Sequence, residues 1–290
     1  MSRRSKWPRL LESVRRRALH HSALRAQPRV LCNSIQKSGT HLIVGLAAAL
    51  PGLRAYGRRA YWHHLNRERV EPRKRPTLEG EIRRLRKCLP GEIYRGHLAA
   101  APQIADLLHR RGFKHLFVYR DPRDVVVSLM FWWERHQEID AWPFRYFQGL
   151  ASSEERLRFL IEGWPANLDD PRFPAEVGYP NVAERFAEFL PWLSDPQCLS
   201  IRFEDLVGPE SKTDTYRRIA EYLLTDPTQD ELSLAVERMS AGSDPSQSKT
   251  FRKGRSGDWR ETLNAEHVAL MKRHAGKLLV ELGYEKDLDW

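Results

Sequence analysis

The stretch that most constrains the fold is residues 29–50, where an apolar run passes through a short polar turn into a second apolar run. Residues 29–35 are typical of a buried strand, and residues 40–50 of a helix that stops at Pro51-Gly52. A strand that leads directly into a helix is the unit from which parallel sheets are built. The sequence therefore predicts that this segment opens a parallel α/β sheet.

The rest of the chain repeats this alternation of strands and helices. Further strands are predicted at residues 92–98, 115–120 and 199–203. The expected helices are residues 124–135, 182–193, 211–224, 229–240 and 265–282. The very basic residues 54–91, interrupted by prolines, are expected to form surface helix and loop. We expect one three-layer α/β domain around a central, mainly parallel sheet.

Three segments stand apart from this pattern. Residues 1–28 are predicted to form a basic amphipathic helix, docked on the domain or in peripheral contact with a membrane surface. The domain itself is expected to span 29–290. Within it, the aromatic- and proline-rich residues 141–180 resemble a variable cap, and residues 241–260 a loop rich in Gly, Ser and Lys.

The charge and the cysteine content limit the kinds of partner and the cellular compartment that we expect for this protein. The 290 residues carry a formal charge of +10, which favours nucleotides, nucleic acid, acidic glycans or a membrane surface without choosing among them. Three scattered cysteines without a C-x-x-C pair suggest neither a disulfide framework nor a zinc site. The longest apolar run, 42–50, is too short to span a bilayer, so we expect a cytoplasmic protein.

The polar turn after the first strand is suited to an anion. Lys37, Ser38, Gly39 and Thr40 offer a lysine, two hydroxyls and backbone amides at a helix start, where unpaired N–H groups and the helix dipole favour negative charge. The turn is not a Walker A loop, because Lys37 precedes its glycine. Alone, it could equally be an ordinary polar turn with a solvated lysine.

Four segments in the same order resemble the sulfotransferases that use 3′-phosphoadenosine-5′-phosphosulfate (PAPS). Residues 34–40 are similar to the family's 5′-phosphosulfate loop, with Gln36 at a position that is usually proline. Residues 119–128 resemble its 3′-phosphate motif, and residues 203–205 its Tyr-Glu-Asp strand end. Residues 252–260 resemble its C-terminal R-K-G-x-x-G-D-W-K loop.

The resemblance implies a fold like that of P-loop nucleotide transferases and binding of PAPS, whose product is 3′,5′-adenosine bisphosphate (PAP), without a metal. It implies that residues 241–260 cover the nucleotide. The nucleotide-binding residues it implies are Lys37, Ser38, Gly39, Thr40, His41, Arg120, Ser128, Phe203, Arg252, Lys253 and Gly254. For Arg120 an ion pair with Asp124 is the alternative, and for Phe203, the expected adenine-stacking residue, a place in the core.

His97 is the candidate general base. The segment 94–98 resembles a family strand end of the K-T-H-L type, with Gly96 in place of threonine and Arg95 in place of lysine. An imidazole can accept a hydroxyl proton at neutral pH. The implied reaction is in-line sulfuryl transfer to a hydroxyl or amine. Lys37 and the amides of residues 38–40 would stabilise the leaving group, and Arg95 and Ser128 would assist.

The acceptor pocket is expected to include Phe131 and Trp132. Residues 131–133 cannot all share one helix face, so at least one of them should belong to the core. The acceptor could be a small molecule, a lipid or a glycan, and the protein a monomer or a homodimer.

The alternatives to a sulfotransferase are a P-loop nucleotide kinase, a basic nucleic-acid-binding protein and a non-catalytic relative of the sulfotransferases. We expect no nucleic-acid partner.

Overall fold

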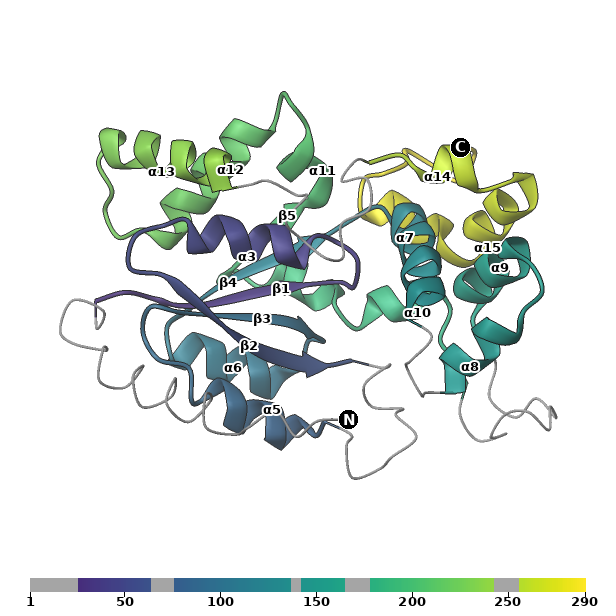
Figure 1. The fold of residues 1–290 in the computed structure, drawn as a ribbon, viewed down its shortest axis with the longest axis horizontal. Helices are drawn as coiled ribbons and strands as arrows, with labels where there is room; N and C mark the ends of the chain where they lie inside the picture. Colours follow the sequence, from purple (N-terminus) through teal and green to yellow (C-terminus); the bar gives the residue numbers. More distant parts are fainter. Residues whose placement is uncertain (1–25, 64–75, 137–141, 165–177, 243–255) are drawn as a thin grey trace.

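The structure, a computed structural model, describes residues 26–63, 76–136, 142–164, 178–242 and 256–290. Its centre is a sheet of five parallel strands in the order β2-β3-β1-β4-β5 (Figure 1). The strands are β1 (Arg29–Ser34), β2 (Arg54–Trp62), β3 (Glu92–Leu98), β4 (Phe113–Tyr119) and β5 (Cys198–Arg202). The predicted parallel α/β sheet is confirmed.

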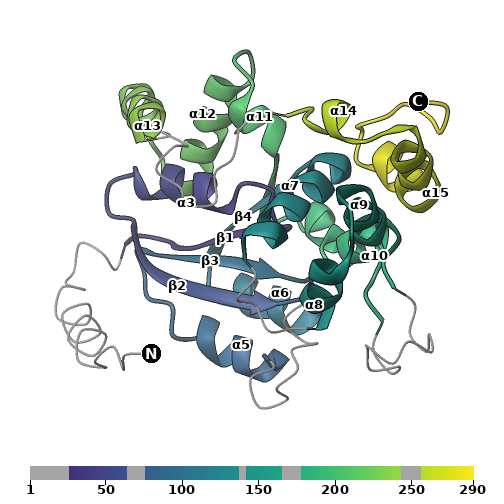
Figure 2. The same ribbon diagram turned by 45° about the vertical axis from the view of Figure 1, so that its right-hand side comes forward.

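Helices cover both faces of the sheet. One face carries α3 (Thr40–Ala48), α12 (Lys212–Leu223) and α13 (Gln229–Gly242), and the other α5 (Leu78–Leu85) and α6 (Pro102–Arg110) (Figures 1 and 2). The remaining elements are α7 (Pro122–Arg135), α8 (Trp142–Gly149), α9 (Ser153–Glu162), α10 (Val182–Ala187), the 3-10 helix η2 (Leu190–Ser194), α11 (Phe203–Val207), α14 (Trp259–Thr262) and α15 (Ala265–Glu281).

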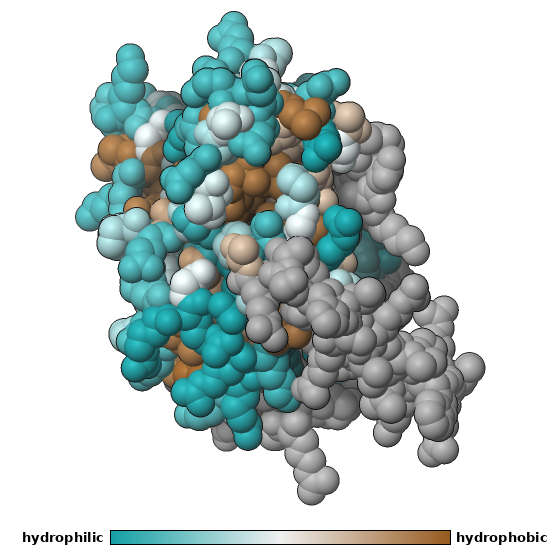
Figure 3. Space-filling model, turned by 90° about the vertical axis from the view of Figure 1, so that its left-hand side faces the viewer, coloured by the Kyte–Doolittle hydropathy of each residue, from teal (hydrophilic) through white to brown (hydrophobic). Residues whose placement is uncertain are grey.

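Side-chain alternation along the strands divides the interior into two cores. In β1, Val30 and Cys32 pack towards α3 and α12, whereas Leu31 packs towards α5 and α6. Among the described residues, the large hydrophobic side chains that stay exposed are Leu234 and Leu288. The side of the molecule at the left of Figure 1 is accordingly mostly hydrophilic, with smaller hydrophobic areas between (Figure 3).

The prediction for residues 54–91 was partly wrong, because they contain the edge strand β2 as well as the surface helix α5. β2 pairs only with β3 and exposes several of its residues, so it lacks an apolar alternation. The expected helix at 182–193 divides into α10 and η2, and α11 begins directly at the end of β5. The amphipathic helix expected in residues 1–28 lies almost wholly outside the described residues.

The parallel strands place all their carboxyl ends at one edge of the sheet. The loop after β1, the end of β3, the residue after β4 and the start of α11 meet there. In open α/β sheets this edge is where ligands bind. Among the described residues, no helix is long and apolar enough to cross a membrane.

Candidate active site

The loop between β1 and α3 is a tight turn held by its own backbone. Lys37 and Gly39 both adopt positive φ, 66° and 100°. A Cβ at Gly39 would lie 2.7 Å from the Phe203 ring, so glycine is required there for space as well as for backbone conformation. The Ser38 amide donates to the Ile35 carbonyl at 3.2 Å. Of the amides at 38–40, that of Ser38 is therefore already used inside the turn.

The same loop offers buried polar groups to a ligand. The Ser38 hydroxyl is buried and has no hydrogen-bond partner within the described part of the chain. The start of α3 receives no side-chain cap from Gly39, which leaves its first amides to an anion or to water. The Thr40 hydroxyl lies 2.6 Å from that of Ser34, which fixes the helix start to β1. These groups fit a phosphate or sulfate.

Arg120 reaches the loop from the neighbouring strand β4. Its Nη1 donates to the Lys37 carbonyl at 3.3 Å, and its guanidinium lies 4.5 Å from the centre of the Phe203 ring. The ion pair with Asp124 considered above is present, at 3.4 Å. Phe203 is buried, in contact with both Arg120 and the loop. Ser128 lies two turns further along α7 and is partly exposed.

Asp124 also anchors the end of the C-terminal loop. Its two carboxylate oxygens accept hydrogen bonds from the amides of Gly257, at 2.8 Å, and Trp259, at 3.0 Å. The predicted nucleotide-binding residues Arg252, Lys253 and Gly254 lie outside the described residues. The described continuation of their segment is thus fixed to the residue that pairs with Arg120.

His97 is the penultimate residue of β3, and its imidazole is held by the neighbouring strand β1. Its Nδ1 lies 2.8 Å from the Ser34 carbonyl, so Nδ1 carries the proton and Nε2 is left as the acceptor. Tyr61 stacks on the imidazole with ring centres 5.5 Å apart. Burial, followed by the charges of Lys37 and other nearby cations, lowers the pKa of His97 to about 4 against an opposing contribution from the Ser34 carbonyl. The ring is neutral at pH 7.

Asn33 is a positioning residue that the sequence did not reveal. Its buried side-chain amide forms two hydrogen bonds with the backbone of Leu98, donating to the carbonyl at 2.9 Å and accepting from the amide at 2.8 Å. Because Leu98 follows His97, these bonds set the end of β3 against β1. The periodicity of an apolar strand gives no signal for such a role; the only sign was a polar residue inside a buried run.

The departures from the family pattern at Gln36 and Gly96 have structural counterparts. The amide nitrogen of Gln36 lies 3.1 Å from the ring nitrogens of His63, so the loop is tied to the residue that follows β2. At Gly96 a Cβ would lie 2.7 Å from the Ala60 carbonyl, so the close approach of β2 requires glycine. Arg95 projects on the same face of β3 as the base and lies 3.4 Å from His41, which is exposed.

The aromatic residues of α7 divide as helix geometry required. Trp133 is fully buried and packs on Phe144, so it belongs to the core. Phe131 and Trp132 are partly exposed. The Lys37 ammonium lies 5.7 Å from the centre of the Trp132 ring, which joins the phosphate loop to the expected acceptor pocket. No group of three or more His, Cys, Asp or Glu in the described residues is arranged to hold a metal ion.

A loop for an anion, an arginine from the next strand and a recessed neutral histidine define a group-transfer site on a P-loop-like fold. A family model described as "Sulfotransferase domain" matches residues 27–283. The chain belongs to this family, and its reaction class is sulfuryl transfer. The family assignment excludes the kinase and the nucleic-acid-binding alternatives as the main function. A comparison with curated proteins finds no match.

Solved structures share the fold at low identity. Mouse sulfotransferase SULT7A1 complexed with PAP is 14% identical with a TM-score of 0.54, over 89% of this chain and 87% of that one. Retinol dehydratase in complex with retinol and PAP is 16% identical with a TM-score of 0.55, over 89% and 83%. A second structure of retinol dehydratase contains androsterone and inactive cofactor PAP, with a TM-score of 0.52. The predicted fold class is confirmed.

Proposed function

We propose that this sulfotransferase uses PAPS and transfers its sulfuryl group to the hydroxyl of a small molecule, with His97 as the base. The observation that carries the proposal is His97 itself, a neutral imidazole at the strand edge whose Nδ1 is held by Ser34. Two structures with this fold contain PAP together with retinol or androsterone. Those ligands support PAP as the product and an acceptor of similar size.

In the proposed reaction the acceptor oxygen attacks sulfur as the bond between sulfur and the 5′-phosphate oxygen breaks. The acceptor proton moves to Nε2 of His97, and PAP leaves with the electron pair of the broken bond. Because Nδ1 is bonded to the Ser34 carbonyl, the imidazolium formed keeps a hydrogen-bond partner on the far side of the ring. Arg95, on the same face of β3, is proposed to stabilise the sulfonate oxygens.

Lys37 and the start of α3 would stabilise the leaving phosphate. The ammonium of Lys37 lies near Trp132, and the amides that start α3 are not capped by a side chain. Ser38 adds the buried hydroxyl that lacks a partner among the described residues. A fixed array of donors aimed at the charge that develops is the largest contribution that such a site can make. Thr40 and His41, at the same helix start, are proposed as further nucleotide-binding residues.

The 3′-phosphate is assigned to Arg120 and Ser128, with Arg252, Lys253 and Gly254 as further contacts from the C-terminal loop. The contact between Arg120 and the Lys37 carbonyl would fix the proposed 3′-phosphate site relative to the loop after β1. The ion pair with Asp124 would hold the Arg120 guanidinium in place for this role. Phe203 is proposed to contact the adenine.

The acceptor would lie between Trp132, Phe131 and His97. Hydroxyl groups of lipids or glycans, and amines, are alternative acceptors for the same reaction. The reaction is compatible with a monomer or a homodimer.

We further propose that residues 29–290 form the single catalytic domain, with residues 141–180 as the cap over the acceptor and residues 241–260 covering the nucleotide. The buried thiols of Cys32 and Cys88 support a reducing compartment such as the cytoplasm.

Replacing His97 tests the assignment of the base. His97→Ala should lower sulfate transfer from labelled PAPS by about 100-fold or more, while the rise in melting temperature caused by PAP should persist. His109→Ala is the matched control, because His109 pairs with Asp195 near the amino end of β4. Near-normal transfer by His97→Ala would remove His97 as the base. Absence of any PAP-induced stabilisation in the unmodified protein would contradict the choice of PAPS.

A further inference from the structure

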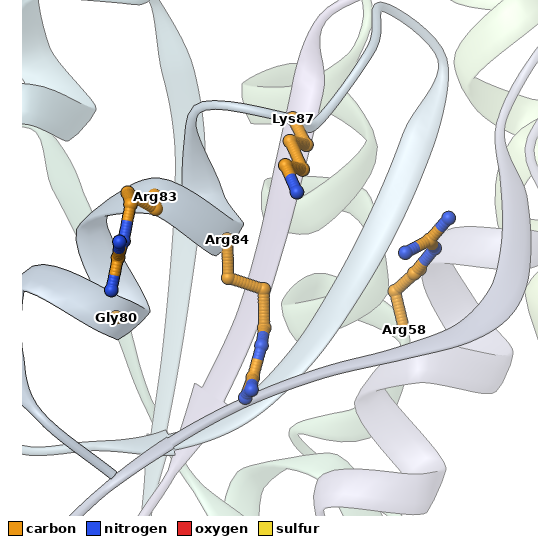
Figure 4. A pocket seen from close by; sticks show the side chains of 5 residues that line it. All are labelled: Arg58, Gly80, Arg83, Arg84 and Lys87. Carbon is orange, nitrogen blue, oxygen red and sulfur yellow. The ribbon is translucent and has the colours of Figure 1, made fainter.

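A second concave site lies on the edge strand, away from the loop that follows β1. Between β2 and α5 is a hollow of about 430 Å³ lined by Arg58, Gly80, Arg83, Arg84 and Lys87 (Figure 4). Such a volume is large enough for a small organic ligand. Apart from Gly80, every lining residue is a cation.

The cations of the hollow come from different elements. Arg83 and Arg84 lie in the last turn of α5 and Lys87 just beyond it, where the helix dipole favours positive charge. That preference does not account for Arg58, which enters the hollow from β2 (Figure 4). Four positive side chains from a strand, a helix and the turn after it therefore line one hollow.

Only one of these cations has a carboxylate partner within the described residues. Arg84 donates to Glu81 at 2.7 Å and reaches the Arg59 carbonyl at 3.5 Å. Glu81 is buried and also accepts from the Tyr61 amide, so its charge is fully engaged. No ion pair joins Arg58, Arg83 or Lys87 to a carboxylate in the described part of the chain. The repulsion among these three positive charges is therefore reduced by solvent or by a bound anion.

The hollow and the candidate active site lie on opposite faces of the sheet. Tyr61 stacks on His97, whereas its neighbour Ala60 packs in the core on the α5 and α6 side. Arg58 faces α5, as its place in the hollow shows. A ligand bound there would not contact the loop that holds Lys37.

We propose that this hollow is a binding site for a small polyanion that carries two or more phosphate or sulfate groups. Three cations without a carboxylate partner exceed what a single monovalent anion can neutralise, and the space admits a ligand with several charged groups. Arginine binds such oxygens in a bidentate manner, and lysine adds a point charge. This site is additional to the proposed PAPS site and does not depend on it.

Titration calorimetry of the full chain with tripolyphosphate tests the site. One equivalent of PAP is added to fill the proposed nucleotide site; an excess is avoided, because PAP itself carries two phosphates and would compete for the hollow. The triple variant Arg58→Gln/Arg83→Gln/Lys87→Gln removes the cations without a carboxylate partner and keeps Arg84, whose loss would strand the buried Glu81. We expect its affinity to fall at least about tenfold, as the loss of several charge-assisted contacts implies. The matched control Arg238→Gln/Arg273→Gln/Lys277→Gln removes the same charge from exposed positions on α13 and α15.

The outcomes separate the site from general charge effects. Affinity within about twofold of the unmodified protein in the control, with the large loss confined to the hollow variant, supports the proposal. Equal losses in both variants, undiminished binding by the hollow variant, or no binding by the unmodified protein would each overturn it. Orthophosphate should bind more weakly than tripolyphosphate. A polysulfated disaccharide, titrated in parallel, shows whether the site prefers phosphate or sulfate groups.

Discussion

The environment of His97 combines burial, positive charge and one fixed hydrogen bond. Its position at the end of β3, below Tyr61, removes solvent from much of the ring. Lys37 and Arg95 add positive charge nearby, and together these effects hold the pKa of His97 at about 4. The Ser34 carbonyl selects the tautomer that leaves Nε2 as acceptor. His97 therefore stays neutral well below pH 7, and its Nε2 remains able to accept a proton.

The pH dependence of turnover should report this lowered pKa. A base works only while it is neutral, and with a pKa of about 4 His97 stays neutral down to about pH 5. We expect kcat/KM to stay level between pH 7 and pH 5.5 and to fall only at lower pH, provided that the protein remains folded by circular dichroism. A fall centred near pH 6.5, the value for a free histidine, would contradict this environment.

The neighbouring strand β2 explains why two residues at the site depart from the family pattern. Gln36 contacts His63, which follows β2, and Gly96 is required because the Ala60 carbonyl of β2 lies so close. In the sequence they were only departures from a family pattern. In the structure both are consequences of how β2 approaches β3 and the loop.

At the scale of elements, β1, β3, β4 and β5 were predicted from the sequence, and the edge strand β2 was not. β1 and β4 are short, mainly apolar runs followed by polar residues, and β3 is a short segment with apolar residues near both ends; such short segments are typical of strands. β2 contains three arginines and has one neighbour, so its strand character comes from pairing with β3 rather than from its own pattern. The junction of the β1 and β3 ends includes two hydrogen bonds from Asn33, whose only sign in the sequence was a polar residue inside a buried run.

Removing the Asn33 side chain should disturb the junction of β1 and β3. Asn33→Ala leaves the buried Leu98 amide without its partner, while the Leu98 carbonyl keeps a bond from Trp192. We expect the free energy of unfolding to fall by about 1–3 kcal/mol, and kcat to fall with PAP affinity nearly retained. Urea denaturation and steady-state kinetics measure the two effects.

The control for this variant is Ser233→Ala, whose exposed side-chain bond on α13 should matter by less than about 0.5 kcal/mol. If Asn33→Ala kept full kcat, Asn33 would serve stability alone. If it lost PAP affinity as strongly as kcat, the effect would lie in the loop after β1 rather than in His97.

At the scale of the whole molecule, the C-terminal segment is joined to the strand edge through Arg123. This buried guanidinium forms three hydrogen bonds with Asp121, at 2.7, 2.9 and 3.2 Å, and pairs with Glu285. It lies between the rings of Trp259 and Trp290, at 4.0 and 4.5 Å from their centres. The start of α7, the start of α14 and Trp290 thus share one cation.

Loss of this cation should destabilise the domain strongly. Arg123→Ala leaves carboxylates on Asp121 and Glu285 without their partner, which implies a cost of about 3–5 kcal/mol in the free energy of unfolding. Arg123→Lys should restore little, because lysine lacks the planar fork. The control Arg217→Ala, from an exposed pair with Glu221, should cost less than about 1 kcal/mol by urea denaturation. Comparable costs for the two alanine variants would refute the role given to Arg123.

The sequence by itself determined the parallel α/β class, the loop at residues 36–40 and the order of motifs that identifies a sulfotransferase. Those features are local, since each depends on the residues of one strand, one turn or one helix start. The tertiary structure decided what depends on segments far apart in the chain. It set the edge strand β2, the bonds from Asn33 to Leu98, the anchoring of Gly257 on Asp124 and the cationic hollow beside α5, because each needs contacts that form only once the sheet has assembled.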